Sequence, residues 1–92
     1  MKVNICGLLH EVIECEDIFD VDIHLGQIDY KDLTIKVNKD MPEEAKKEAI
    51  CHEMVHGMLV HLGFNDESNN EQFVQALGNA IYQGFLIKEV EE

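Results

Sequence analysis

The chain has no arginine and little positive charge of any kind. Lysine and arginine together number 7 against 19 aspartates and glutamates, which gives a formal net charge of −12 at pH 7. Proteins bind nucleic acids largely through basic side chains that contact phosphates. The shortage of basic residues therefore predicts that nucleic acid is not a partner, and it argues equally against anionic membrane surfaces.

Long apolar segments are also missing. No stretch approaches the roughly 18 apolar residues of a membrane span, and the start of the chain carries one lysine and no apolar run of signal-peptide length. Cysteine is scarce, and Cys6, Cys15 and Cys51 form no C-x-x-C pair. An odd number of cysteines with this spacing favours reduced, mostly buried thiols. We therefore expect a cytoplasmic protein without membrane partners.

What is present is a globular composition, with 46% hydrophobic residues in a chain of 92. This length predicts one domain, residues 1–92. Two alternating patterns near the N-terminus predict two hairpins, and helical patterns follow them. The predicted fold class is α+β, a small twisted antiparallel sheet followed by two packed helices. The expected segments are β-hairpins over residues 1–40, a helix over 41–62, a loop over 63–69 and a second helix over 70–88.

Local signals mark the ends of the first helix. Asp40 followed by Glu43 predicts an N-cap, and Pro42 belongs in a first turn, where its missing N–H costs nothing. Gly63 suits the left-handed residue that ends a helix. Upstream, residues 33–37 form the clearest strand pattern, and the acidic residues 16–22 fit either a short helix or a connection.

The second helix has its own apolar periodicity. Four large side chains recur at helical spacing along it. We expect them to form the buried stripe of this helix. They are Phe73, Leu77, Ile81 and Phe85.

The segment from His52 to His56 fits the pattern H-E-x-x-H. Residues four apart on a helix lie on one face, so His52 and His56 can direct two imidazoles at one metal ion. Glu53 lies about 100° around the helix from His52, where it can serve as general base toward a zinc-bound water. The alternative is an ordinary helix with two partly exposed histidines. The apolar residues that flank the motif argue against that alternative.

A catalytic zinc site uses three protein ligands and keeps one position open. Glu71 is the preferred third ligand, because it opens the second helix, which the loop folds back beside the first. Ser68 and Glu71 also fit the S-x-x-E capping box, so the alternative is that Glu71 only caps that helix. Asp66 and Glu67 in the loop are the other candidates. His61 should point away from the histidine pair, because it lies five residues beyond the motif on the same helix.

Peptide hydrolysis also needs a donor that stabilises the developing oxyanion. The chain offers histidines and tyrosines for this role, and nothing in the sequence places any of them near the motif. The candidates are His10, His24, Tyr30 and Tyr82.

Several stretches together resemble the small phage and prophage proteins of the ImmA/IrrE metallopeptidase type. They are CHEMVHGMLVHLGF, EQFVQALGNAIYQ, LGQIDYKDLTIKVNKDMPEE and the opening hairpin, which cover nearly the whole chain. The resemblance implies a reduced gluzincin-like fold with an active-site helix and a glutamate helix. It implies a zinc ion held by His52, His56 and Glu71, with Glu53 as the base. Larger relatives are associated with cleavage of repressors of mobile elements, which implies a peptide or protein substrate such as a repressor.

These patterns predict a zinc-dependent metallopeptidase that hydrolyses a peptide bond with a zinc-activated water. The alternative is a catalytically inactive regulatory or interaction module of the same fold, with structural zinc or no metal. Zincin-like sheets offer an edge strand on which an extended substrate pairs as an added strand. Residues 25–29 and 33–37 are the candidate edges.

Overall fold

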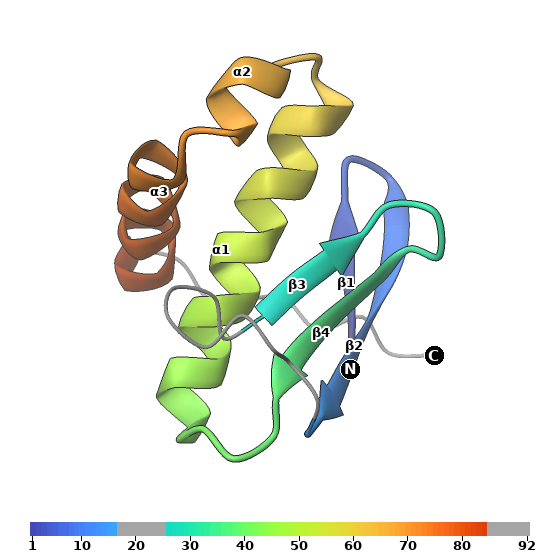
Figure 1. Cartoon of the computed structure of the whole chain (residues 1–92), viewed down its shortest axis with the longest axis vertical. Coiled ribbons are helices and arrows are strands. Elements are labelled where there is room, and N and C mark those ends of the chain that lie inside the picture. The colour runs from blue at the N-terminus through green and yellow to red at the C-terminus, as the bar shows by residue number, and fades with distance from the viewer. Residues whose placement is uncertain (17–25, 85–92) are drawn as a thin grey trace.

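The computed structural model describes residues 1–16 and 26–84, and within them it confirms the α+β class. Residues 17–22 of the acidic segment and 85–88 of the expected second helix lie outside the described part of the chain. The elements are β1 (Lys2–Ile5), β2 (Leu8–Cys15), β3 (Gly26–Asp29), β4 (Thr34–Asn38), α1 (Glu43–His61), α2 (Asn65–Ser68) and α3 (Glu71–Gly84). Figure 1 shows α1 as the middle layer, with the sheet on one side and α3 on the other.

The sheet is mixed, with strand order β1-β2-β4-β3. Both expected hairpins are present, since β1 pairs with β2 and β3 pairs with β4 in antiparallel register. The expectation of an antiparallel sheet throughout is wrong, because β2 and β4 pair in parallel, with Val12 opposite Ile35. The alternation of apolar and polar residues in a hairpin predicts only how its own two strands pair. It carries no information on how one hairpin docks against the other.

One face of the sheet packs against α1 and forms the core. The buried cluster consists of Val3, Ile5, Ile35, Val37 and Ile50. Burying an aliphatic side chain of this size contributes about 1.5–3 kcal/mol, so the contact between the sheet and α1 stabilises the domain. Leu33 was expected to share the strand pattern of 33–37. It precedes β4 instead and has a positive φ of 55°, which places it in the β3–β4 turn.

The first helix begins later than expected. It starts at Glu43 with Pro42 at the cap position, no side chain caps it, and Asp40 is therefore not its N-cap. Glu43 and Glu44 in the first turn supply negative charge at the positive end of the helix dipole. Gly63 has a φ of 87°, the left-handed conformation expected just after the helix. Among the described residues, no helix combines the length and apolar character needed to cross a bilayer.

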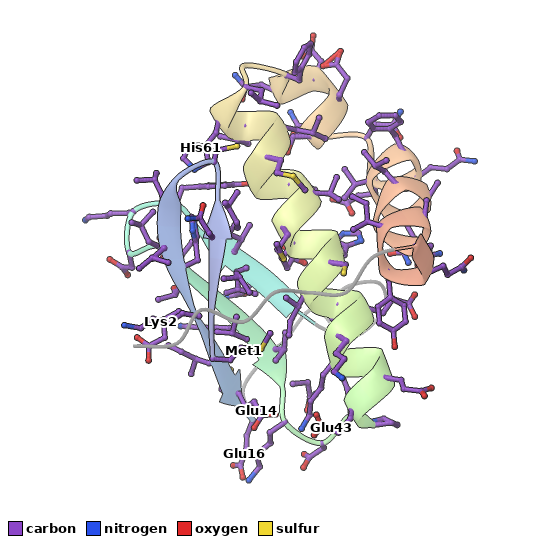
Figure 2. All side chains as sticks on the ribbon, turned by 180° about the vertical axis from the view of Figure 1, so that it is seen from behind. Met1, Lys2, Glu14, Glu16, Glu43 and His61 are labelled. Carbon is purple, nitrogen blue, oxygen red and sulfur yellow. The ribbon has the colours of Figure 1, made fainter. Side chains whose placement is uncertain are left out.

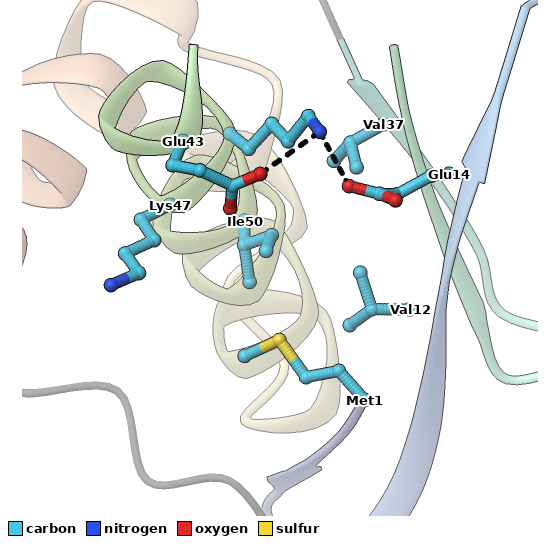
Figure 3. A pocket seen from close by; sticks show the side chains of 8 residues that line it. Met1, Val12, Glu14, Val37, Glu43, Lys47 and Ile50 are labelled. Carbon is cyan, nitrogen blue, oxygen red and sulfur yellow. Dashed lines mark hydrogen bonds and ion pairs between the residues drawn. The ribbon is translucent and has the colours of Figure 1, made fainter. Parts of the chain in front are cut away.

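The start of α1 is tied to the sheet through a buried lysine. Lys46 Nζ lies 2.6 Å from Glu14 Oε1 on β2 and 3.2 Å from Glu43 Oε1. The hydrogen bond with Glu14 raises the pKa of the Lys46 ammonium. Figure 3 shows these contacts at the rim of a cavity of about 430 Å³, whose apolar wall includes Val12 and Ile50. The contacts join the first turn of α1 to the end of β2.

The expected loop 63–69 contains the one-turn helix α2, and this changes how α3 begins. The backbone N–H of Phe73 donates to Asn70 Oδ1 at 3.1 Å, so Asn70 provides the capping side chain. Ser68 is buried beneath α2 and its hydroxyl contacts His56 instead. The alternative of a capping box with Ser68 at the N-cap is therefore wrong, because Asn70 occupies the position before the helix.

The buried face of α3 also differs from the predicted stripe. Phe73 and Leu77 are exposed by 42% and 36%, whereas Val74 and Gly78 are buried. A Cβ at Gly78 would lie 3.2 Å from His52 Cα, so the backbones of α3 and α1 are in direct contact there. The predicted stripe consisted of large side chains, but two helices this close need a small residue at the crossing point.

Replacing Gly78 with alanine should destabilise the protein. The new methyl would meet the Cα and N of His52, at 3.2 and 3.4 Å, and backbone atoms cannot rotate away. Overpacking of this kind costs about 1–3 kcal/mol, which exceeds the gain of about 1 kcal/mol in helix propensity. The measurement is the free energy of unfolding in urea.

Gly84→Ala is the matched control, because nothing lies within 4 Å of a Cβ built at this position on the same helix. We expect a change within about 0.5 kcal/mol, or a small gain. Equal destabilisation by the two substitutions would contradict the close helix contact.

Candidate metal centre

Three side chains converge between α1 and the first turn of α3. His52 Nε2 lies 3.0 Å from one carboxylate oxygen of Glu71, and His56 Nε2 lies 3.0 Å from the other. The two imidazole rings stand 5.0 Å apart between centroids. One ligand atom from each residue falls within 4.8 Å of the other two, so the group is compatible with a metal ion.

The donor set and its spacing suit a small divalent cation. In a tetrahedral zinc site with bonds near 2.0–2.1 Å, neighbouring ligand atoms lie about 3.3 Å apart. The observed separations of 3.0 Å between Glu71 and each imidazole are close to that value. Two imidazoles and one carboxylate are three ligand groups, so a four-coordinate ion held by them would have one further position.

Gln75 orients the first imidazole. It lies one turn beyond Glu71 on α3, and its Oε1 accepts a hydrogen bond from His52 Nδ1 at 2.7 Å. The Gln75 amide nitrogen in turn donates to Glu48 Oε1 at 3.2 Å and to Asn79 Oδ1 at 3.0 Å. This fixes which end of the amide faces the ring. The Nδ1 atom of His52 therefore carries a proton, which leaves Nε2 as the ring nitrogen that faces Glu71 and could bind a cation in place of that contact.

Ser68 orients the second imidazole, that of His56. Its Oγ lies 3.1 Å from His56 Nδ1, and the residue is only 5% exposed. With both Nδ1 atoms engaged, both Nε2 atoms face Glu71. Sequence reasoning missed Gln75 and Ser68. Gln75 lies four residues after Glu71 on the same helix face, and this spacing could have predicted its role. The role of Ser68 depends on α2, which no sequence pattern predicts.

Glu53 is buried beside the cluster, with 5% of its surface exposed. Burial, and to a smaller degree the negative charge of Glu71, raise the pKa of the Glu53 carboxyl to about 8. The influence of Glu71 on Glu53 shows that the two carboxyl groups are neighbours. A divalent cation between them would act in the opposite direction, because it favours the charged carboxylate.

The other ligand candidates lie elsewhere. Asp66 and Glu67 are exposed on α2 and do not join the described cluster. His61 was expected to point away from the histidine pair, and it does. Figure 2 shows it at the end of α1 beside the β1–β2 turn, and its ring meets that of buried His10 edge-on at 6.2 Å.

The candidate oxyanion donors have different surroundings in the structure. Burial raises the pKa of the Tyr30 hydroxyl, a hydrogen bond with Ser68 lowers it, and the charges of Glu53 and Glu71 raise it. Tyr30 lies in the turn after β3 and is 39% exposed. His10 is fully buried, with Nδ1 2.9 Å from the carbonyl oxygen of Leu8.

Tyr82 and His24 were the other two candidates. Tyr82 lies eleven residues after Glu71 on α3, about 16 Å further along the helix axis. His24 lies outside the described residues.

Comparison of the chain with known protein families, with curated proteins and with solved structures finds no match in any of the three. The case for the function therefore rests on the residues of this chain and on the geometry between them.

Replacing Glu71 with glutamine should weaken zinc binding by more than about a hundredfold. The substitution removes a charged ligand atom, and changes one shell further out already cost about 10- to 100-fold. Isothermal titration with zinc chloride measures the affinity. Asp66→Asn and Glu67→Gln are the controls, since both change an acidic neighbour outside the cluster. A larger loss in either control than in Glu71→Gln would contradict the assignment.

Replacing Gln75 with leucine tests the orienting hydrogen bond. Leucine has a similar size and cannot accept from His52 Nδ1, so we expect zinc affinity to fall about 10- to 100-fold while all three proposed ligands remain. Gln72→Leu on the exposed side of the same helix is the control. Unchanged affinity in Gln75→Leu would show that Gln75 does not set the orientation of the His52 ring.

Proposed function

We propose that this protein is a zinc-dependent metallopeptidase of the ImmA/IrrE type. One observation carries the proposal. The two histidines of the H-E-x-x-H motif and Glu71 converge on one point, with the remaining glutamate of the motif buried beside them. Gln75 and Ser68 support it, because each holds an imidazole with Nε2 turned to that point.

The residues divide the chemistry between them. Zinc held by His52, His56 and Glu71 supplies a Lewis acid and a water made acidic enough to attack at neutral pH. Glu53 accepts a proton on its carboxylate from the attacking water and passes it to the nitrogen of the leaving amine. Burial, and to a smaller degree the charge of Glu71, raise the pKa of the Glu53 carboxyl, and a cation at the cluster would favour the charged carboxylate that accepts the proton.

The substrate in this proposal is an extended peptide segment. Of the two strands expected as an edge, 33–37 forms β4, which lies between β2 and β3. β3 lies at an edge of the described sheet and packs against α1. Among the described strands only β4 pairs with it, which favours its outer side as a place where an added strand could pair. This supports the segment at 26–29 as the substrate-binding edge.

The proposed substrate and cellular location follow from the same proposal. The resemblance to the ImmA/IrrE type favours a protein substrate such as a repressor of a mobile element, and the charge of −12 disfavours nucleic acid as partner. All three cysteines are free thiols, which supports a cytoplasmic location.

Glu53→Gln tests the mechanism. The amide keeps the size of the side chain and cannot accept the proton, so hydrolysis should fall by at least about a hundredfold, the lower range for a lost general base. The assay uses the zinc-loaded chain and a library of fluorogenic peptides.

Zinc stoichiometry in the same samples provides the control, because Glu53 is not a ligand and the variant should retain the metal. Equal hydrolysis by wild type and Glu53→Gln, both with zinc bound, would overturn the mechanism. No hydrolysis by either would favour a non-catalytic module.

A further inference from the structure

We propose that Glu48 is a positioning residue of the metal centre. Acting through the side-chain amide of Gln75, its carboxylate keeps a proton on Nδ1 of His52 and so leaves Nε2 of that ring for a metal ion. The inference rests on the metal centre of the proposed function, and it adds a residue that lies outside the three candidate ligands.

Four side chains form a row of hydrogen bonds across the contact between α1 and α3. Glu48 and His52 lie one turn apart on α1, and Gln75 and Asn79 lie one turn apart on α3. Gln75 Oε1 lies 2.7 Å from His52 Nδ1, and Gln75 Nε2 lies 3.2 Å from Glu48 Oε1 and 3.0 Å from Asn79 Oδ1. All four side chains are partly or fully buried. The row therefore links the first imidazole to a carboxylate on its own helix by way of the facing helix.

The orientation of the Gln75 amide decides where the His52 ring carries its proton. In the observed orientation the amide oxygen faces Nδ1 and accepts a hydrogen bond from it. If the amide turned by 180°, its nitrogen would donate to Nδ1, and the proton of a neutral ring would then lie on Nε2. A ring nitrogen that carries a proton cannot bind a metal ion. One of the two amide orientations is therefore compatible with a metal ion at Nε2 of His52.

The Glu48 carboxylate is the member of the row that selects this orientation. Asn79 has an amide of its own, which can turn to offer either an oxygen or a nitrogen, and an imidazole can likewise donate or accept at Nδ1. A carboxylate has only acceptor oxygens. With the Gln75 amide reversed, two acceptor oxygens would face each other where the 3.2 Å hydrogen bond now lies. The loss of that bond inside a partly buried network is costly, so Glu48 sets the direction of the other bonds.

A series of substitutions at residue 48 tests this role by isothermal titration with zinc chloride. Glu48→Gln keeps the size and can donate or accept, so both orientations of the Gln75 amide make equal numbers of hydrogen bonds. About half of the molecules would then be ready to bind, and zinc affinity should fall about twofold. Glu48→Lys can only donate and favours the reversed amide, so the affinity should fall about 10- to 100-fold, the cost of losing an orienting partner.

Two controls separate this role from the effect of charge alone. Glu44→Lys makes the same charge change one turn earlier, at an exposed position of α1, and should change zinc affinity less than Glu48→Lys does. In a Gln75→Leu background the amide is absent, so Glu48→Lys should there lower the affinity by a much smaller factor. Equal losses with and without the amide would mean that the charge acts directly on the ion, which would overturn the proposal.

The ring nitrogens of His52 give a readout that a merely structural role would not change. In metal-free protein at about pH 8, where an ordinary imidazole is neutral, ¹⁵N signals of the ring show which nitrogen carries the proton. We expect a protonated Nδ1 in the wild type, a bare Nδ1 in Glu48→Lys and intermediate signals in Glu48→Gln. A bare Nδ1 in the wild type, or the same signals in all three, would contradict the role of Glu48. Glu48→Gln alone decides if Glu48→Lys does not fold.

The outcomes also distinguish this inference from the function it rests on. If the wild type binds zinc and the variants at residue 48 bind it equally well, the role of Glu48 is wrong and the metal centre stands. If the wild type binds no zinc, the metal centre is wrong and Glu48 positions no ligand. If zinc binds but no peptide is cleaved, the peptidase function is wrong, and the zinc affinities and ring signals still decide the role of Glu48.

Discussion

The contact between Gly78 and the backbone of His52 is the constraint on which the metal centre depends. It sets the distance between α3 and α1 at the position of the first histidine. Glu71 and Gln75 lie two turns and one turn before Gly78 on the same helix face, so the same approach brings one to both Nε2 atoms and the other to His52 Nδ1. A larger residue at the crossing would move both side chains away from the imidazoles at once.

The second feature that shapes the candidate metal centre is its negative charge. Glu53 and Glu71 are near each other in a chain whose net charge is already −12. Without a cation, Glu71 satisfies both imidazoles, and Glu53 has a higher proton affinity than an exposed glutamate. A divalent ion would compensate both carboxylates while keeping the ring orientations set by Gln75 and Ser68. The centre is therefore arranged so that a single cation relieves several unfavourable interactions together.

The sequence predicted the fold class, both hairpins and the convergence of His52, His56 and Glu71, because local periodicity and the four-residue spacing report helix faces directly. It failed where the answer depended on contacts between elements. The parallel pairing of β2 with β4 is invisible to patterns within a hairpin, and Gly78 was overlooked in favour of Phe73. Ser68 reaches His56 from a one-turn helix, which carries no periodic signal.

The position of the metal-binding residues along the chain has a consequence for how the domain can diversify. The three candidate ligands and both orienting side chains lie between His52 and Gln75, on α1, α2 and α3, whereas β3, the edge that we propose for a substrate, belongs to the sheet. Closing so short a segment costs little chain entropy, so the centre can assemble from local contacts. Strand positions that point away from the core could then change without altering the arrangement of His52, His56 and Glu71.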